Sequence, residues 1–254
     1  NSSDICPLNY VVYRHDRNIH GGGTCIAVKS NLISSQVQEF ETNCEITWCE
    51  VQLNGNKNIY VGAFYRPPGS PDTVLEELEK SISKIKEKNA DARIFLGGDF
   101  NLPGIEWSNA SIKPGAYNSK MCDMLLNISQ NHNMQQMVQT PTRKQNILDL
   151  CFTTHPGLVA NTFTGPGLSD HDHMVFVDTQ ISAKINKKKP RTVYQYKKAD
   201  WEEIREHVEE AAEQFWNSLP SERSTTENWN AFKDIVSSIM DSHIAKKKLS
   251  GKYS

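Results

Sequence analysis

One eight-residue stretch constrains the fold of this chain more than any other, because it has the pattern of a buried strand that ends in polar side chains. Residues 94–101 read Ile-Phe-Leu-Gly-Gly-Asp-Phe-Asn. The apolar run has the right length for a strand buried on both faces. The two glycines allow a sharp backbone turn and the close approach of a ligand. We therefore expect Asp99 and Asn101 at the mouth of a sheet, placed to hold an anion or a metal-bound water.

A second polar segment precedes the apolar run at residues 174–177. Residues 167–173 read Gly-Leu-Ser-Asp-His-Asp-His. Carboxylates beside a histidine favour its protonated form, and a protonated histidine stabilises charge on a phosphate during hydrolysis. The alternatives to this role are that His171 lies in a solvated loop, or that it belongs to a metal cluster that includes His173. We expect the two polar segments to form one composite hydrolytic site.

Two further positions extend this site. Asp149 lies in an otherwise apolar run, where a buried carboxylate needs a partner, and His171 is the candidate. Tyr65 and Arg66 end an apolar run just before two prolines and are candidates for phosphate contacts. The plainer alternatives are a turn cap for Asp99 and Asn101 and an ordinary strand end for Tyr65.

The order of the expected elements favours an α+β fold of two packed sheets flanked by helices. We expect helices that begin at Ser70-Pro71 and near residue 117. The expected strands cover residues 10–14, 24–28, 46–53, 59–65, 94–96, 135–139, 147–153, 159–163 and 173–179.

The character of the chain changes near residue 184. We expect a main domain over 1–183, a charged, proline-containing linker over 184–199, and a helical hairpin over 200–254. Asp200 and Glu203 have the spacing of a capping box. The expected apolar positions of the two helices are Ile204, Val208, Ala211 and Phe215, then Trp229, Phe232, Val236 and Ile239.

Composition restricts the partners and the compartment. The 254 residues carry a formal net charge of −2, so nucleic-acid binding would depend on local patches rather than on a global positive field. The six cysteines form no Cys-x-x-Cys pair, so we expect neither a zinc site nor a disulfide framework built from them. We find no signal peptide and no membrane-spanning run, and expect an intracellular protein of the nucleus or cytoplasm.

The motifs together resemble the endonuclease/exonuclease/phosphatase superfamily. The resemblance is carried by Gly-Asp-Phe-Asn at 98–101, Ser-Asp-His at 169–171, the strand acid Asp149 and the tyrosine-ended strand. Three longer strings resemble the endonuclease domain of non-LTR (LINE-type, jockey-like) retrotransposons: Tyr-Arg-Pro-Pro-Gly at 65–69, Gly-Gly-Asp-Phe-Asn-Leu-Pro-Gly-Ile-Glu-Trp at 97–107, and Thr-Pro-Thr-Arg at 140–143. The resemblance spans about residues 9–180 and implies a four-layer, DNase I-like sandwich.

The resemblance also implies catalytic roles. Asp99 would orient or deprotonate the attacking water, and Asn101 would hold the scissile phosphate. His171, supported by Asp149, would stabilise the phosphate oxygens. Asp170 would bind Mg²⁺, with Mn²⁺ as the alternative.

The implied substrate is DNA, nicked to expose a 3′-hydroxyl that primes reverse transcription. Tyr65 would contact the phosphate. The implied DNA contacts are Arg66, Thr142, Arg143 and Ser169. No membrane partner is expected, and such a domain is normally fused to a reverse transcriptase.

One departure from the family pattern affects the expected activity. The family places an asparagine-bearing strand and a metal-binding glutamate before the segment at which this sequence begins, and we interpret Glu50 as structural. We therefore expect an N-terminally truncated domain with weak or absent nicking activity. The alternatives are a catalytically dead remnant that binds nucleic acid or protein, and the same fold acting on a phospholipid, an inositol phosphate or an RNA tail.

Overall fold

The structure, a computed structural model, describes residues 6–7, 9–18, 22–55, 57–167, 173–185, 191–218 and 220–249. The chain divides into two compact units, Asn1–Asn186 (unit 1) and Lys187–Ser254 (unit 2). The two units are described separately below.

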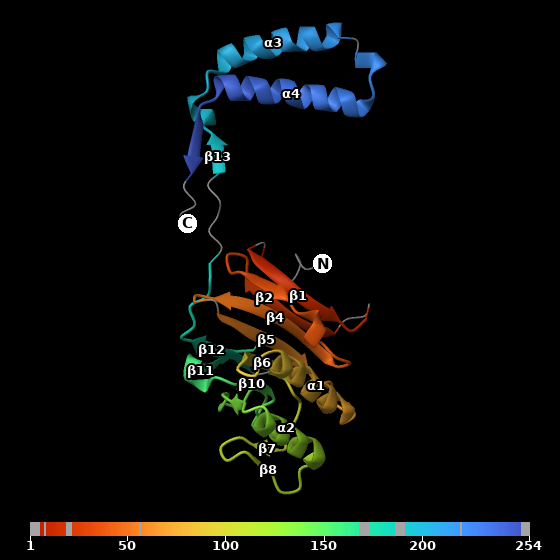
Figure 1. Ribbon diagram of the computed structural model, residues 1–254, viewed down its shortest axis with the longest axis vertical. Helices are drawn as coiled ribbons and strands as arrows, with labels where there is room; N and C mark the ends of the chain where they lie inside the picture. Colours follow the sequence, from red (N-terminus) through yellow and green to blue (C-terminus); the bar gives the residue numbers. More distant parts are fainter. Residues whose placement is uncertain are drawn as a thin grey trace. The chain divides into compact units, whose positions relative to one another are not determined.

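A six-stranded sheet forms the centre of unit 1 (Figure 1). Its strands, in spatial order, are β3 (Ser34–Gln36), β4 (Glu45–Leu53), β5 (Lys57–Tyr65), β6 (Arg93–Asp99), β10 (Asp149–Thr153) and β9 (Gln135–Gln136). All neighbours pair antiparallel except β5 and β6, which are parallel because helix α1 (Thr73–Lys88) connects them. This crossover brings the ends of β5 and β6 to the same edge of the sheet.

Two helices cover one face of this sheet. The apolar stripe of α1 is fully buried, as its spacing predicts, and α2 (Ser119–Asn131) packs into the same core. Trp48 of β4 is fully buried there, and its indole N–H donates to the Ser81 hydroxyl at 2.8 Å. Ser81 in turn donates to the Phe40 carbonyl at 2.6 Å, so the buried indole N–H of Trp48 and the buried hydroxyl of Ser81 both have hydrogen-bond partners.

Two hairpins lie against the opposite face. They are β1 (Tyr10–Asp16) with β2 (Gly23–Lys29), and β11 (Val159–Pro166) with β12 (His173–Thr179). Val28 of β2 packs with Cys49, Val51 and Phe95 of the large sheet. An apolar cavity of about 680 Å³ lies on this face and is lined by residues of β2, β4, β5, β6, β10 and β12. The expected mixed α/β architecture of packed sheets and flanking helices is confirmed, and its second sheet consists of these two separate hairpins.

The double glycine of β6 has a different role from the one expected. The strand continues through Gly97 and Gly98 and ends at Asp99, so the expected sharp turn at the glycines is wrong. Gly98 has a φ of +150°, and a Cβ atom there would lie 1.8 Å from the Phe64 carbonyl oxygen. Only glycine therefore lets β5 and β6 approach each other so closely beside the polar strand ends.

Short elements complete unit 1. They are β7 (Ile105–Glu106), β8 (Ser111–Ile112) and the 3₁₀ turns η2 (Gln38–Phe40) and η3 (Pro156–Leu158).

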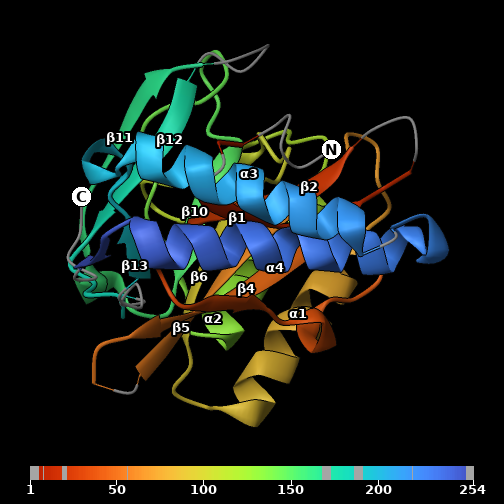
Figure 2. The ribbon, with the colours of Figure 1, turned by 90° about the horizontal axis from the view of Figure 1, so that it is seen from above.

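Unit 2 is a helical hairpin closed by a small sheet. Helices α3 (Trp201–Asn217) and α4 (Thr225–His243) lie side by side (Figure 2). Strand β13 (Arg191–Tyr194) pairs with β14 (Lys246–Leu249), and the 3₁₀ turns are η4 (Tyr196–Lys198) and η5 (Pro220–Glu222). Within the expected linker over 184–199, residues Arg191–Tyr194 form a strand that pairs with residues after α4.

The helix ends differ from the expected caps. Asp200 accepts hydrogen bonds from the backbone N–H groups of Glu202 and Glu203, each at 3.2 Å, as an N-cap does. The reciprocal capping box forms at Ser224 and Glu227 of α4 instead.

The apolar stripe expected for unit 2 is only partly buried. Val208, Trp229 and Phe232 are 46%, 57% and 51% exposed. Two helices alone present too little surface to cover every apolar side chain of both. No helix in the described part of the chain is long and apolar enough to cross a membrane.

Candidate active site

Four polar side chains form a row across neighbouring strands at one edge of the large sheet. Glu45 of β4 is in register with Tyr65 of β5, Tyr65 with Asp99 of β6, and Asp99 with Asp149 of β10. Paired residues on neighbouring strands project from the same face of a sheet. The row therefore lies on the face that carries the two hairpins. Tyr65, Asp99 and Asp149, distant in sequence, meet here as expected.

Asn101 is bound tightly to Asp99. Its side-chain amide donates to Asp99 Oδ2 at 2.8 Å and to the Arg66 carbonyl at 2.9 Å, while its backbone N–H donates to Asp99 Oδ1 at 3.0 Å. Its φ of +50° is left-handed, a conformation that asparagine tolerates better than most residues. Both side-chain amide hydrogens are used in these bonds, so Asn101 orients Asp99 in this structure. The amide therefore does not donate to a phosphate here, as the sequence analysis expected it to.

Arg66 does not lie where a DNA contact would need it. Its side chain is 1% exposed, and the guanidinium reaches the carbonyl oxygens of Asn101 at 3.2 Å and Ser70 at 3.4 Å, and Met121 Sδ at 2.9 Å. Burial lowers its pKa from the usual value. The expected phosphate contact of Arg66 is wrong, because its long side chain turns inward and ties the loop after β6 to the loop after β5.

Thr142 is also a positioning residue rather than a DNA contact. It is fully buried, and its hydroxyl accepts hydrogen bonds from the backbone N–H groups of Leu148 and Asp149, both at 3.1 Å. The expected backbone contact of Thr142 with DNA is therefore wrong. The hydroxyl instead fixes the start of β10, which places Asp149 in the row. Arg143 follows in a tight turn whose backbone pairs with Asn146.

The second polar segment falls mostly outside the described residues, which include none of Ser169, Asp170 and His171. His173 is described, and its backbone N–H donates to the Thr142 carbonyl at 3.2 Å. The segment therefore rejoins the described chain beside the residue that positions Asp149. The pairing of His171 with Asp149 stays a prediction.

Sequence analysis did not identify two residues of the site, Arg17 and Glu45. Arg17 binds Glu45 through both carboxylate oxygens, at 2.6 and 2.9 Å, and its guanidinium carbon lies 5.4 Å from the centre of the Tyr65 ring. The hydrogen bond that Arg17 donates to Glu45 raises the pKa of Arg17. Arg17, His15 and Tyr65 line a cavity of about 260 Å³.

No local motif marks these two residues. Arg17 lies in a polar loop, and Glu45 precedes the expected strand by one residue. Glu50, the other acid of β4, lies on the opposite face and accepts from Asn58 at 2.7 Å, in agreement with its structural interpretation.

The donor set of the row suits a hard cation. Asp99 and Asp149 sit on neighbouring strands, where two carboxylates repel each other unless a cation or a proton lies nearby. Carboxylate oxygens are the ligands that Mg²⁺ and Mn²⁺ prefer. The residues present therefore fit a divalent metal that is bound through oxygen.

One family model matches the part of the chain that carries most of the row. Residues 59–175, which contain Tyr65, Asp99, Asn101 and Asp149, match a family model described as endonuclease-reverse transcriptase. A search of curated proteins found no relative of this chain.

Solved structures with a similar chain course include three proteins. The human Nocturnin catalytic domain with bound sulfate is 11% identical, covering 72% of this chain and 75% of that one, with a TM-score of 0.45. An endonuclease/exonuclease/phosphatase family protein from Leptotrichia buccalis is 13% identical, covering 72% and 74%, with a TM-score of 0.40. Truncated Caenorhabditis elegans TDP2 is 12% identical, covering 72% and 78%, with a TM-score of 0.38.

The family model covers three of the four residues of the row, Tyr65, Asp99 and Asp149, and not Glu45. Residues 59–175 of this chain are therefore similar to the endonuclease-reverse transcriptase family.

Proposed function

We propose that unit 1 is a Mg²⁺-dependent DNA endonuclease domain of a retrotransposon-derived protein, which nicks one strand of DNA. The observation that carries the proposal is the row of Tyr65, Asp99 and Asp149 at one sheet edge, with Asn101 fixed on Asp99. The family-model description supports the endonuclease class. In such a protein the exposed 3′-hydroxyl would serve a reverse transcriptase as its primer.

The chemistry follows from the side chains of the row. Asp99, held by two hydrogen bonds from Asn101, is the base that orients the attacking water and takes its proton. Tyr65, on the neighbouring strand, contacts the phosphate through its phenol. His171, supported by Asp149, stabilises the charge that develops on the phosphate oxygens.

A divalent cation fits among the carboxylates of this edge. Asp99 and Asp149, together with Asp170, offer the oxygen atoms that would hold it. When bound, the cation supplies charge neutralisation at the scissile phosphate.

Arg17 is the proposed DNA-backbone contact on this side of the row. Its side chain stays 39% exposed although Glu45 binds the guanidinium, which lies against the Tyr65 ring beside the cavity of about 260 Å³. Arginine is suited to bind phosphate oxygens through two N–H groups. Arg143 and Ser169 remain proposed DNA contacts.

The test is nicking of supercoiled plasmid DNA by the 254-residue chain, with Mg²⁺, Mn²⁺ or EDTA. We expect weak, metal-dependent nicking that is lost in Asp99→Ala and His171→Ala, and weaker DNA binding in Arg17→Ala. Glu50→Gln is the matched control, because this acid lies on the other face of β4 and should leave nicking unchanged. Soluble phosphate esters, assayed in parallel, should not be cleaved.

Three outcomes would contradict the proposal. Nicking that survives Asp99→Ala would place the chemistry elsewhere. DNA binding without nicking by the folded wild-type chain would support a catalytically dead binding module. Cleavage of phosphate esters in preference to plasmid would indicate another substrate class.

A further inference from the structure

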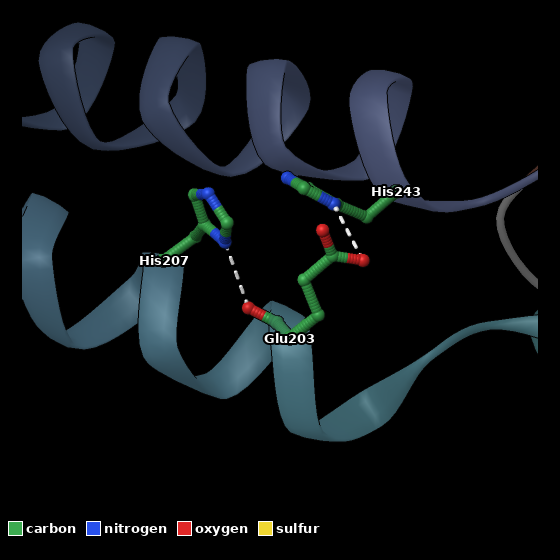
Figure 3. Close-up of side chains that lie close together, drawn as sticks. All are labelled: Glu203, His207 and His243. Atoms are coloured by element: carbon green, nitrogen blue, oxygen red, sulfur yellow. Dashed lines mark hydrogen bonds and ion pairs between the residues drawn. The ribbon is translucent and has the colours of Figure 1, made fainter.

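A cluster of three potential metal ligands lies between the two helices of unit 2. Glu203 and His207 are four residues apart on α3 and so share one face of that helix, and His243 is the last residue of α4 (Figure 3). One ligand atom from each of the three lies within 4.8 Å of the other two. Metal sites in helical bundles are built from facing helices in this way.

One hydrogen bond in the cluster orients the imidazole of His207 so that it can bind a metal. His207 Nδ1 lies 2.9 Å from the carbonyl oxygen of Glu203, to which it donates. This bond fixes the tautomer and leaves the Nε2 lone pair available, and the close-up shows that nitrogen on the side of the ring that faces α4. A hydrogen bond from the second ring nitrogen to a carbonyl is the usual support of a metal-ligating histidine.

The spacing of the other two ligands suits a tetrahedral ion. His243 Nδ1 lies 3.4 Å from Glu203 Oε2. A charge-assisted hydrogen bond is normally about 2.7–2.9 Å, so this pair is longer than a close ion pair. Bonds of about 2.0–2.2 Å to a tetrahedral Zn²⁺ separate neighbouring ligand atoms by roughly 3.3–3.6 Å. The measured separation falls in that range.

The surroundings favour a cation at this point. His243 lies at the carboxyl end of α4, where the backbone carbonyls carry partial negative charge, and Glu203 adds a carboxylate. Within α3 and α4 no described side chain is fully buried, so the helix pair has little core of its own. Small units of this kind are commonly stabilised by a structural metal.

We propose that Glu203, His207 and His243 bind Zn²⁺, which joins the first two turns of α3 to the last turn of α4. Two imidazole nitrogens and one carboxylate oxygen form a ligand set typical of Zn²⁺, whereas Mg²⁺ prefers oxygen ligands alone. Water completes the fourth position. The site is independent of the proposed endonuclease function.

The test is metal binding by the 254-residue chain, with Zn²⁺ measured by competition with a fluorescent chelator and Co²⁺ measured by its visible absorption. We expect one tight site and the intense absorption bands of tetrahedral Co²⁺. His207→Gln and His243→Gln should each weaken Zn²⁺ binding by at least about 100-fold, since they remove a direct ligand rather than its support. Glu203→Gln should weaken it to a smaller extent.

Matched controls separate this site from other ligands of the chain. Glu209→Gln changes an exposed glutamate of the same helix, and His155→Gln changes a histidine of unit 1; both should bind Zn²⁺ as the wild type does. Zn²⁺ should also raise the unfolding temperature of the wild type but not of His243→Gln, with circular dichroism confirming that the variant keeps its helices. Tight Zn²⁺ binding that survives in both histidine variants, or no binding by the folded wild type, would overturn the proposal.

Discussion

Asp99 accepts two hydrogen bonds from a single residue, because the backbone N–H and the side-chain amide of Asn101 both donate to its carboxylate, at 3.0 and 2.8 Å. The left-handed backbone of Asn101 makes this possible by folding the residue back toward the end of β6. The carboxylate is thereby held in one orientation within the row that includes Tyr65 and Asp149. The function of Asn101 in this structure is to position Asp99.

Asn101→Gly should lower the rate of plasmid nicking by about 10–100-fold while the protein stays folded. Glycine adopts the left-handed backbone readily, so the variant removes the amide without adding strain. The magnitude is that of removing a hydrogen-bonded support from a site carboxylate. Asn133→Gly is the matched control, because Asn133 has a similar φ of +52° outside the row. Equal nicking rates for Asn101→Gly and the wild type would show that Asp99 needs no such support.

Arg66→Met should lower the stability of unit 1 but not its affinity for DNA. The change removes a buried guanidinium from the carbonyls of Asn101 and Ser70, and each buried group left without a partner costs about 1–3 kcal/mol. Denaturant unfolding followed by near-ultraviolet circular dichroism measures the loss. Arg205→Met, at an exposed position of α3, is the control and should leave the stability of unit 1 unchanged.

The salt dependence of DNA binding distinguishes the two roles of Arg66. A phosphate contact that is lost reduces the slope of log K against log salt by about 1. We expect an unchanged slope for Arg66→Met and a reduced one for Arg17→Ala. A reduced slope for Arg66→Met would restore Arg66 as a DNA contact.

Thr142→Val should lower the free energy of unfolding of unit 1 by about 1–3 kcal/mol and reduce nicking. Valine keeps the shape of threonine but leaves the N–H groups of Leu148 and Asp149 without their shared acceptor. Thr142→Ser retains the hydroxyl and should recover most of both properties. If Val and Ser variants behave alike, the hydroxyl does not position Asp149.

The cysteines should divide into reactive and protected thiols. Burial raises the pKa of Cys44 and Cys151 to about 11 and that of Cys49 to about 12, whereas Cys25 is exposed. The thiolate is the reactive form, so a disulfide reagent at mildly alkaline pH should modify Cys25 quickly and these three only after unfolding. Mass spectrometry of the labelled peptides gives the order of reaction.

The same thiols give a dependence of stability on pH. Above the ordinary thiol pKa of 9.0 the unfolded chain loses its thiol protons while the native chain keeps them. The free energy of unfolding should therefore fall as pH rises from 9.0 toward the native pKa values. Cys49→Ala should make this fall shallower, and an unchanged slope would contradict the assignment.

The sequence alone determined the elements that carry the site. Apolar periodicity predicted the main strands and the four α-helices of the described residues, and a buried strand followed by Asp99 and Asn101 predicted a hydrolytic site. Such patterns are visible in sequence because each depends on residues that lie close together along the chain.

Tertiary structure alone decided what each polar residue does there. Arg66 and Thr142 look like DNA contacts in sequence, but packing buries them and assigns their donors and acceptors to backbone groups of the site loops. Arg17 and Glu45 carry no motif, yet strand register places them beside Tyr65. Exposure and hydrogen-bond partners depend on segments that meet only after folding, so no local pattern encodes them.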